Sequence, residues 1–318
     1  MDFRVILIKS PSEQYDISEL ACQVDFTDNI NKAGVCTFPV VKSSVRPEIG
    51  NGVKITCEGT VYFVGNIFKV NTTHEDQIKV TAYDQLRYLK ATDTFTFKNG
   101  ETASDVVRQI CGKMGLSLGQ IEETGYTPGI RLIDEKDMLD TITDYIRMTL
   151  TAKKEIYYIK DVAGKVVLKN IRGSITNLTL DPESLMIGYA HEGSIDGNSF
   201  NRIKLIRDNK QTGKRELYIA QDSNRFKEWG GILQYYEKLD DTVNPEQAKA
   251  KADALLYLKN RVQQTLSVDA LGDQDIRAGN MLHIYLPELG LSKFLLCTMA
   301  KHTFTNHAHT VKIDLRLV

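Results

Sequence analysis

Two segments of this chain, more than two hundred residues apart, repeat one pattern of turn and strand residues. Each begins with Gly-Asn and a short alternating strand. A turn, a longer apolar strand ending in Lys, a polar loop and a last strand alternating around a Lys follow. The copies occupy residues 50–55, 62–69 and 78–81, and residues 279–284, 294–301 and 311–314. Period-2 alternation places every second side chain on one face, so the match predicts two similar β-barrels. We expect Gly50-Asn51 to superpose on Gly279-Asn280, and Lys69 on Lys301.

Length and charge limit the classes of protein that this chain can represent. Its 318 residues are enough for two or three domains with separate cores. A net charge of −1 argues against specific nucleic-acid binding through bulk positive charge. No apolar run approaches the roughly 20 residues that a membrane-spanning helix needs, so we expect no membrane insertion. Residues 1–9 alternate as a strand and lack the parts of a signal peptide, which predicts synthesis in the cytoplasm without a signal peptide.

The remaining patterns predict a mainly β fold with an α+β insert. Residues 1–90 alternate between Gly, Pro and Asn clusters, as in a small barrel or sandwich, and form the first β domain. Residues 91–172 form a middle domain with two helices and a β-hairpin. The first helix has a capped start at 102–105 and runs to Met114, the second starts near Asp137, and the hairpin spans 156–168.

Residues 173–318 are predicted to form the second β-barrel domain, with a hairpin from residues 201–206 and 215–220 and an inserted helix at 245–262. Asn244 is the expected cap of this helix, Pro245 suits its first turn, and Gln247 can reach back to the cap. We expect its apolar stripe to pack on the outside of the second barrel, with Lys251 exposed. The stripe consists of Ala248, Ala252, Leu255 and Leu256.

Three histidines near the end of the chain are the best candidates for a metal site. His307 and His309 are two residues apart, where alternate strand residues share a face, and His302 lies close by. Residues 305–308 resemble the tip of a hairpin, and no carboxylate or Cys motif accompanies them. We therefore favour a solvated turn with incidental histidines over a zinc site.

Other polar groups give no catalytic pattern. The carboxylate pairs Glu122-Glu123, Asp134-Glu135 and Asp240-Asp241 lie beside turn residues, and residues 273–279 lack the glycine and terminal glutamate of a calcium loop. The phosphate-binding, nucleophile-elbow and zinc-protease motifs are missing. Trp229 is interpreted as a core or interface aromatic, and the five scattered cysteines (Cys22, Cys36, Cys57, Cys111 and Cys297) as reduced, buried thiols. We assign no catalytic, cofactor-binding or metal-binding residue.

Four stretches together carry a family resemblance: residues 194–205, 244–262, 265–280 and 301–310. They resemble the PBSX-type baseplate hub proteins of contractile phage tails and phage-tail-like bacteriocins (tailocins), within the late control gene D hub family. Residues 83–114 also resemble the passage from the first barrel to the middle domain in that family, so the resemblance covers essentially the whole chain.

The resemblance implies two tail-tube-like β-barrels flanking the middle domain, and a structural rather than enzymatic role. It implies a homotrimer with pseudo-six-fold symmetry that joins the hexameric tail tube to the trimeric spike and nucleates tube assembly in the tail baseplate. LysM-containing or other baseplate proteins and the tape-measure protein are further partners that it suggests.

The main alternative is a tail-associated peptidoglycan hydrolase or a cell-wall carbohydrate-binding module, because such tails cross a cell wall. A carbohydrate binder exposes aromatic platforms along a groove, whereas this chain has one Trp, and its Tyr residues fall mostly within strand patterns. Cell-wall lysis by the purified protein would favour this alternative.

Overall fold

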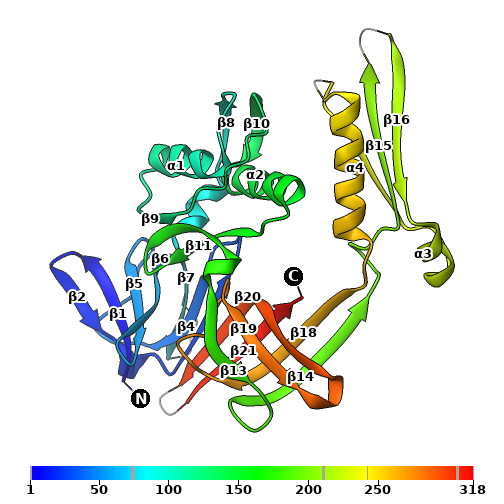
Figure 1. The fold of residues 1–318 in the computed structure, drawn as a ribbon. Coiled ribbons are helices and arrows are strands. Elements are labelled where there is room, and N and C mark those ends of the chain that lie inside the picture. The colour runs from blue at the N-terminus through cyan, green and yellow to red at the C-terminus, as the bar shows by residue number, and fades with distance from the viewer. Residues whose placement is uncertain (1, 73–75, 210–211, 242, 306–307, 318) are drawn as a thin grey trace. The chain divides into compact units, whose positions relative to one another are not determined.

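The computed structural model describes all residues except 1, 73–75, 210–211, 242, 306–307 and 318 (Figure 1). The chain forms two compact units. Unit 1 contains residues 1–149, 156–190 and 266–318, and unit 2 contains residues 150–155 and 191–265. The fold is mainly β, as the alternating sequence patterns predict, and each unit has its own core.

The first part of unit 1 is antiparallel β structure. Its strands are β1 (Phe3–Ser10), β2 (Glu13–Asp16), β3 (Gln23–Asn29), β4 (Val35–Val41), β5 (Gly52–Cys57), β6 (Thr60–Thr72) and β7 (Gln77–Tyr83). Burial alternates along them, so that Val24 and Phe26 of β3 are buried and Asp25 between them is partly exposed. The buried side chains meet in one core, which the period-2 pattern anticipates.

The middle of unit 1 combines helices and short strands. These are β8 (Thr92–Phe97), α1 (Ala103–Lys113), β9 (Leu118–Ile121), β10 (Arg131–Asp137), α2 (Met138–Lys153), β11 (Tyr157–Val162) and β12 (Lys165–Asn170). A capping box between Thr102 and Asp105 starts α1, which confirms the capped start predicted at 102–105. The predicted hairpin is also confirmed as the β11–β12 pair. The pairing of β8 with β10 and the parallel pairing of β9 with β12 were not predicted.

The end of unit 1 belongs to the second β repeat. Its strands are β13 (Ile175–Leu180), β14 (Met186–Ser194), β18 (Gln263–Leu271), β19 (Met281–Leu286), β20 (Leu291–Thr305) and β21 (His309–Arg316). The last residues of β14 and the first residues of β18 fall in unit 2. The strand order of the first repeat is β3-β4-β7-β6-β5-β1, and the order of the second is β14-β18-β21-β20-β19-β13. The duplication read from the sequence is therefore present in the topology, with one difference: β13 pairs with β19 in parallel, whereas β1 pairs with β5 antiparallel.

The backbone confirms the predicted equivalence of Gly50-Asn51 and Gly279-Asn280. Both glycines have φ +92°, a left-handed conformation that glycine adopts without a Cβ clash. The Gly50 N–H donates to Ile67 O at 2.8 Å, and the Gly279 N–H donates to Cys297 O at 2.7 Å. In return the Ile67 N–H donates to Asn51 O, and the Cys297 N–H to Asn280 O. The two repeats thus start from the same hydrogen-bonded turn.

The predicted match of Lys69 to Lys301 is wrong by two residues. A bulge directly follows Ile67 in β6 and Cys297 in β20, so Lys69 matches Met299 and Lys301 matches Asn71. Lys69 is exposed, and the Lys301 side chain is 45% exposed. The core does not constrain the position of an exposed lysine, so such a residue marks no strand register.

The two repeats share one sheet. Strand β20 pairs with β3, which joins them into a 13-stranded sheet whose order ends at β14 and β2. Within the described residues this order is an open path and does not close into a barrel. What the structure establishes is a duplicated β unit in a continuous sheet.

Unit 2 contains a three-stranded sheet with order β16-β15-β17 and one long helix. Its elements are β15 (Arg202–Asn209), β16 (Lys214–Gln221), α3 (Ser223–Glu228), β17 (Gln234–Lys238) and α4 (Pro245–Lys259). The predicted hairpin is the β15–β16 pair. The predicted start of the long helix is confirmed, because Asn244 and Gln247 form a capping box with Pro245 in the first turn.

The predicted placement of this helix on the second barrel is wrong. Ala248, Ala252 and Leu255 of α4 pack against β15 and β16 in a core separate from that of the second repeat. A helical apolar stripe requires some apolar sheet face but does not specify which one. Lys251 is also half-buried rather than exposed, and its Nζ lies 2.7 Å from Glu237 Oε1.

Candidate assembly surface

The junction between the two repeats is a backbone ladder. Residues 291–296 of β20 pair with β19, and residues 299–305 of the same strand pair antiparallel with β3, from Met299 opposite Asn29 to Thr305 opposite Gln23. Side chains reinforce this ladder, because the Thr303 hydroxyl donates to Asp25 at 2.7 Å and Lys301 Nζ lies 3.5 Å from the same carboxylate. One strand therefore serves both repeats.

A buried ionic group lies next to this ladder. Asp28 of β3 accepts from Lys160 Nζ of β11 at 2.6 Å and from the Ala278 N–H at 3.1 Å. Lys160 also donates to Ala278 O at 2.8 Å. The Lys160 and Asp28 side chains are only 6% and 5% exposed. The group ties the first repeat, the middle segment and the second repeat together at one point.

Burial lowers the pKa of Lys160, and the Asp28 carboxylate opposes that effect by favouring the charged ammonium. A buried pair of this kind contributes little net stability compared with apolar side chains, but leaving one charge without its partner is costly. Its contribution is therefore positional: three separate segments must be in place for both charges to be satisfied.

Arg277 extends the junction to strand β6. Its guanidinium donates to the backbone oxygens of Val61 and Tyr62 at 3.2 and 3.1 Å, and lies 4.4 Å from the centre of the Tyr62 ring. A cation over an aromatic face adds an attraction that does not depend on strand pairing. Arg277 precedes the Gly279 turn of the second repeat, so this contact fixes that turn against the first repeat.

His302 and His309 do not lie in a solvated turn, and that prediction is wrong for both residues. His302 is fully buried on β20, His309 is half-buried on β21, and their Nδ1 and Nε2 atoms are 2.9 Å apart. Burial lowers the pKa of His302 well below its usual value and that of His309 to about 4, with Arg277 as the next cause in both cases. The alternation of buried Ala300, His302 and Phe304 could have revealed this core position.

Three of the other candidate residues make contacts that are structural. His307 lies outside the described residues. Glu123 pairs with Arg108, Asp134 accepts from the Thr94 hydroxyl at 2.7 Å, and the Arg225 guanidinium lies over the Trp229 ring. Across the described part of the chain, no three His, Cys, Asp or Glu side chains gather as metal ligands would.

The cysteines agree with the prediction of reduced, buried thiols, except that one of them is not buried. All five are free, and four are buried, but Cys22 is exposed. Burial raises the pKa of Cys111 to about 12, which keeps this thiol protonated and unreactive at neutral pH.

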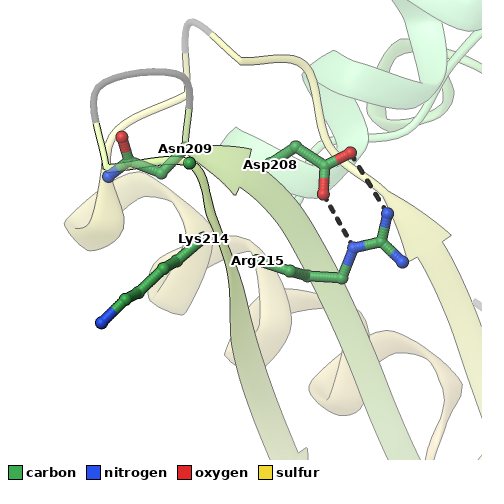
Figure 2. Close-up of a pocket in the computed structure, with 5 residues that line it drawn as sticks. Asp208, Asn209, Lys214 and Arg215 are labelled. Atoms are coloured by element: carbon green, nitrogen blue, oxygen red, sulfur yellow. Dashed lines mark hydrogen bonds and ion pairs between the residues drawn. The ribbon is translucent and has the colours of Figure 1, made fainter.

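A surface hollow at the turn of the β15–β16 hairpin in unit 2 was not predicted. Figure 2 shows the Arg215 guanidinium facing the Asp208 carboxylate, with contacts of 2.7 and 3.3 Å. Lys238 Nζ lies 2.7 Å from the same carboxylate. Hydrogen bonds from Arg215 and then Lys238 hold the pKa of Asp208 below its usual range, so Asp208, near the end of strand β15, is an ion-paired residue and is not poised as a catalytic acid.

The site geometry thus consists of strand ladders and buried ion pairs between repeats. No helix among the described residues combines the length and apolarity that a bilayer crossing requires.

Comparison with known proteins gives the family. The YQBQ-like family model matches residues 24–316. The chain belongs to the YQBQ-like family.

Two curated relatives of this YQBQ-like chain come from Bacillus subtilis strain 168. Protein YqbQ is 28% identical over 269 residues, covering 84% of this chain and 81% of the relative. The phage-like element PBSX protein XkdQ is 27% identical over the same shares. The resemblance to PBSX-type proteins stated from the sequence is therefore confirmed.

Solved tail proteins and a type VI secretion component share the fold of this YQBQ-like chain. The 43 kDa tail protein of prophage MuSo2 from Shewanella oneidensis aligns with a TM-score of 0.71 at 11% identity, covering 98% of this chain and 97% of that protein. A tail protein from Neisseria meningitidis aligns with a TM-score of 0.72 at 12% identity, covering 100% of this chain and 97% of that protein. The c3393 type VI secretion component of Escherichia coli aligns with a TM-score of 0.60 at 10% identity, covering 94% of this chain and 73% of that protein. This chain thus has the fold of phage tail proteins.

Proposed function

We propose that this chain is the structural baseplate hub of a contractile tail, in a phage or a tailocin. In this proposal three copies form a ring that joins the hexameric tail tube to the trimeric spike and nucleates tube assembly. The tube protein and the central spike protein are the principal partners. The protein functions within the assembled tail and has no catalytic role.

The observation that carries the proposal is the internal duplication. The two repeats share their strand order, and both have a glycine with φ +92° and a bulge at the matching position. Three copies of a chain with two such repeats present six similar β units, so one face of the ring suits a six-fold tube and the other a three-fold spike. Closed rotational symmetry makes all subunit contacts equivalent.

The proposal assigns tail-tube-like barrel roles to the domains at 1–90 and 173–318, with residues 91–172 between them. Assembly supplies what the single chain lacks, because the edges of an open sheet can be paired by neighbouring copies. The separate sheet and helix α4 of unit 2 are then an addition to the second repeat and no part of its β unit.

The test combines mass with a functional readout. Light scattering of the purified protein should give three times the mass of one chain, and adding it to the cognate tube protein should shorten the lag before tube polymerisation. A monomer at every concentration, with no effect on that lag, would refute the hub function. Release of soluble fragments from purified cell walls would instead favour a hydrolase.

A further inference from the structure

The ladder between β20 and β3 is a template for a contact that the single chain leaves unmade. Strand order makes β6 the counterpart of β20, and β14 the counterpart of β3. The matching bulges place residues 69–72 of β6 where residues 299–302 of β20 lie, and in β20 these residues pair with β3.

Both counterpart edges lack a neighbouring strand within the described residues. Strand β5 pairs with β6 only from Thr60 to Asn66, so among the strands that the structure describes residues 69–72 have β7 on one side and none on the other. Strand β14 has β18 on one side and stands at the end of the sheet order. Ile187 of β14 is 63% exposed, which is unusual for a large apolar side chain on an open edge.

We infer that copies of this chain join through β6 of one subunit and β14 of the next, paired antiparallel. This inference rests on the proposed ring and specifies its interface. The occupant of each edge is a second copy, because the same fold already makes the equivalent junction inside one chain. Each copy supplies one edge of each kind, so the contact is heterologous and repeats around the ring until it closes.

The orientation of the β14 backbone gives a selective way to block this contact. The Leu271 N–H of β18 donates at 2.8 Å to the backbone oxygen of Leu185, the residue directly before β14, while the Met186 N–H turns back to Asp181 O. Backbone groups alternate sides along a strand, so the amides of Gly188 and Ala190 point away from β18. Replacing Ala190 with proline therefore removes an N–H that points away from β18, and it leaves the hydrogen bonds between β14 and β18 in place.

Two variants test the role of this edge. Ala190→Pro should weaken subunit association by about tenfold or more, through the lost hydrogen bond and the clash of the ring with an incoming strand. Ala190→Thr keeps the N–H and suits a strand, so its association should match the parent. Circular dichroism and melting of the dilute monomer should agree between the two variants. Equal association of both would overturn the inference.

Cross-linking tests which strands meet. In a Cys22→Ser background, Thr72→Cys combined with Ala190→Cys should give covalent dimers and trimers with a short bis-maleimide, far above either single variant. The matched control, Gln14→Cys with Ala190→Cys, samples the β2 edge at the other end of the sheet and should give only monomers.

The outcomes separate the inference from the proposed function. A trimer by light scattering in which Thr72 and Ala190 do not cross-link, or in which Gln14 does, overturns the β6–β14 contact and leaves the hub intact. A protein that stays monomeric at all concentrations overturns both.

Discussion

Replacing Lys160 with methionine should destabilise unit 1 strongly, because it leaves the buried Asp28 carboxylate without its closest cation. Asp28 would keep the Ala278 N–H at 3.1 Å, and the nearest remaining cation would be Arg277, whose Nε is 3.9 Å away. Since both side chains of the pair are at most 6% exposed, water cannot replace the lost ammonium without opening the core. Removing one partner of such a pair costs about 3–5 kcal/mol in the free energy of unfolding.

Thermal unfolding followed by calorimetry measures this cost, with a decrease in melting temperature of about 10 °C for the transition of unit 1. The matched control is Lys165→Met, on the exposed side of the neighbouring strand β12, which should change the free energy of unfolding by less than about 0.5 kcal/mol. The double variant Asp28→Asn/Lys160→Met should recover most of the loss, because neither charge is then left alone. Equal effects of Lys160→Met and Lys165→Met would refute the reasoning.

Three further perturbations have outcomes set by the structure. Gly279→Ala should lower the free energy of unfolding by about 2–4 kcal/mol, and its counterpart Gly50→Ala should lower it by about 1–2 kcal/mol. Both glycines have φ +92°, but only at Gly279 would an added Cβ overlap the Tyr158 ring. Similar melting temperatures of the two variants would contradict this. Leu255→Asp should unfold unit 2 while Lys249→Asp, on the exposed side of α4, should not, and proteolysis followed by mass spectrometry distinguishes them. The free energy of unfolding, measured with denaturant, should be highest above about pH 6.5 and fall by about 3 kcal/mol or more between that pH and about pH 4, because the unfolded chain protonates His309 and His302 before the folded chain does; a flat profile would show that these imidazoles are not buried as described.

Alternation and capping made the local elements predictable. Buried residues at every second position gave the strands, and the Asn244 and Thr102 boxes gave two helix starts. The duplicated Gly-Asn turn was also visible, because only glycine adopts φ +92° without strain, so the residue type itself reports the backbone.

Long-range pairing was not predictable from these patterns. The β20–β3 ladder joins residues 270 or more positions apart, and an alternating strand carries no mark of which neighbour it pairs with. For the same reason the stripe of α4 was placed on the wrong sheet.

Buried polar residues were the other gap in the sequence prediction. Lys160 lies within the alternating hairpin 156–168 of the middle segment, but its partner Asp28 is supplied by the first repeat. His302 was assigned to a turn by its sequence neighbours, although the buried positions on either side place it in the core. The polar groups that hold the junction are thus recognisable only once the strands are paired.

Electron microscopy of the purified protein and of intact tail tips tests the central claim most directly. The hub account predicts a three-fold ring in which six β units of matching strand order surround one axis, two from each copy, at the point where tube meets spike. A ring with any other number of copies, or the protein located away from the junction of tube and spike, would contradict it.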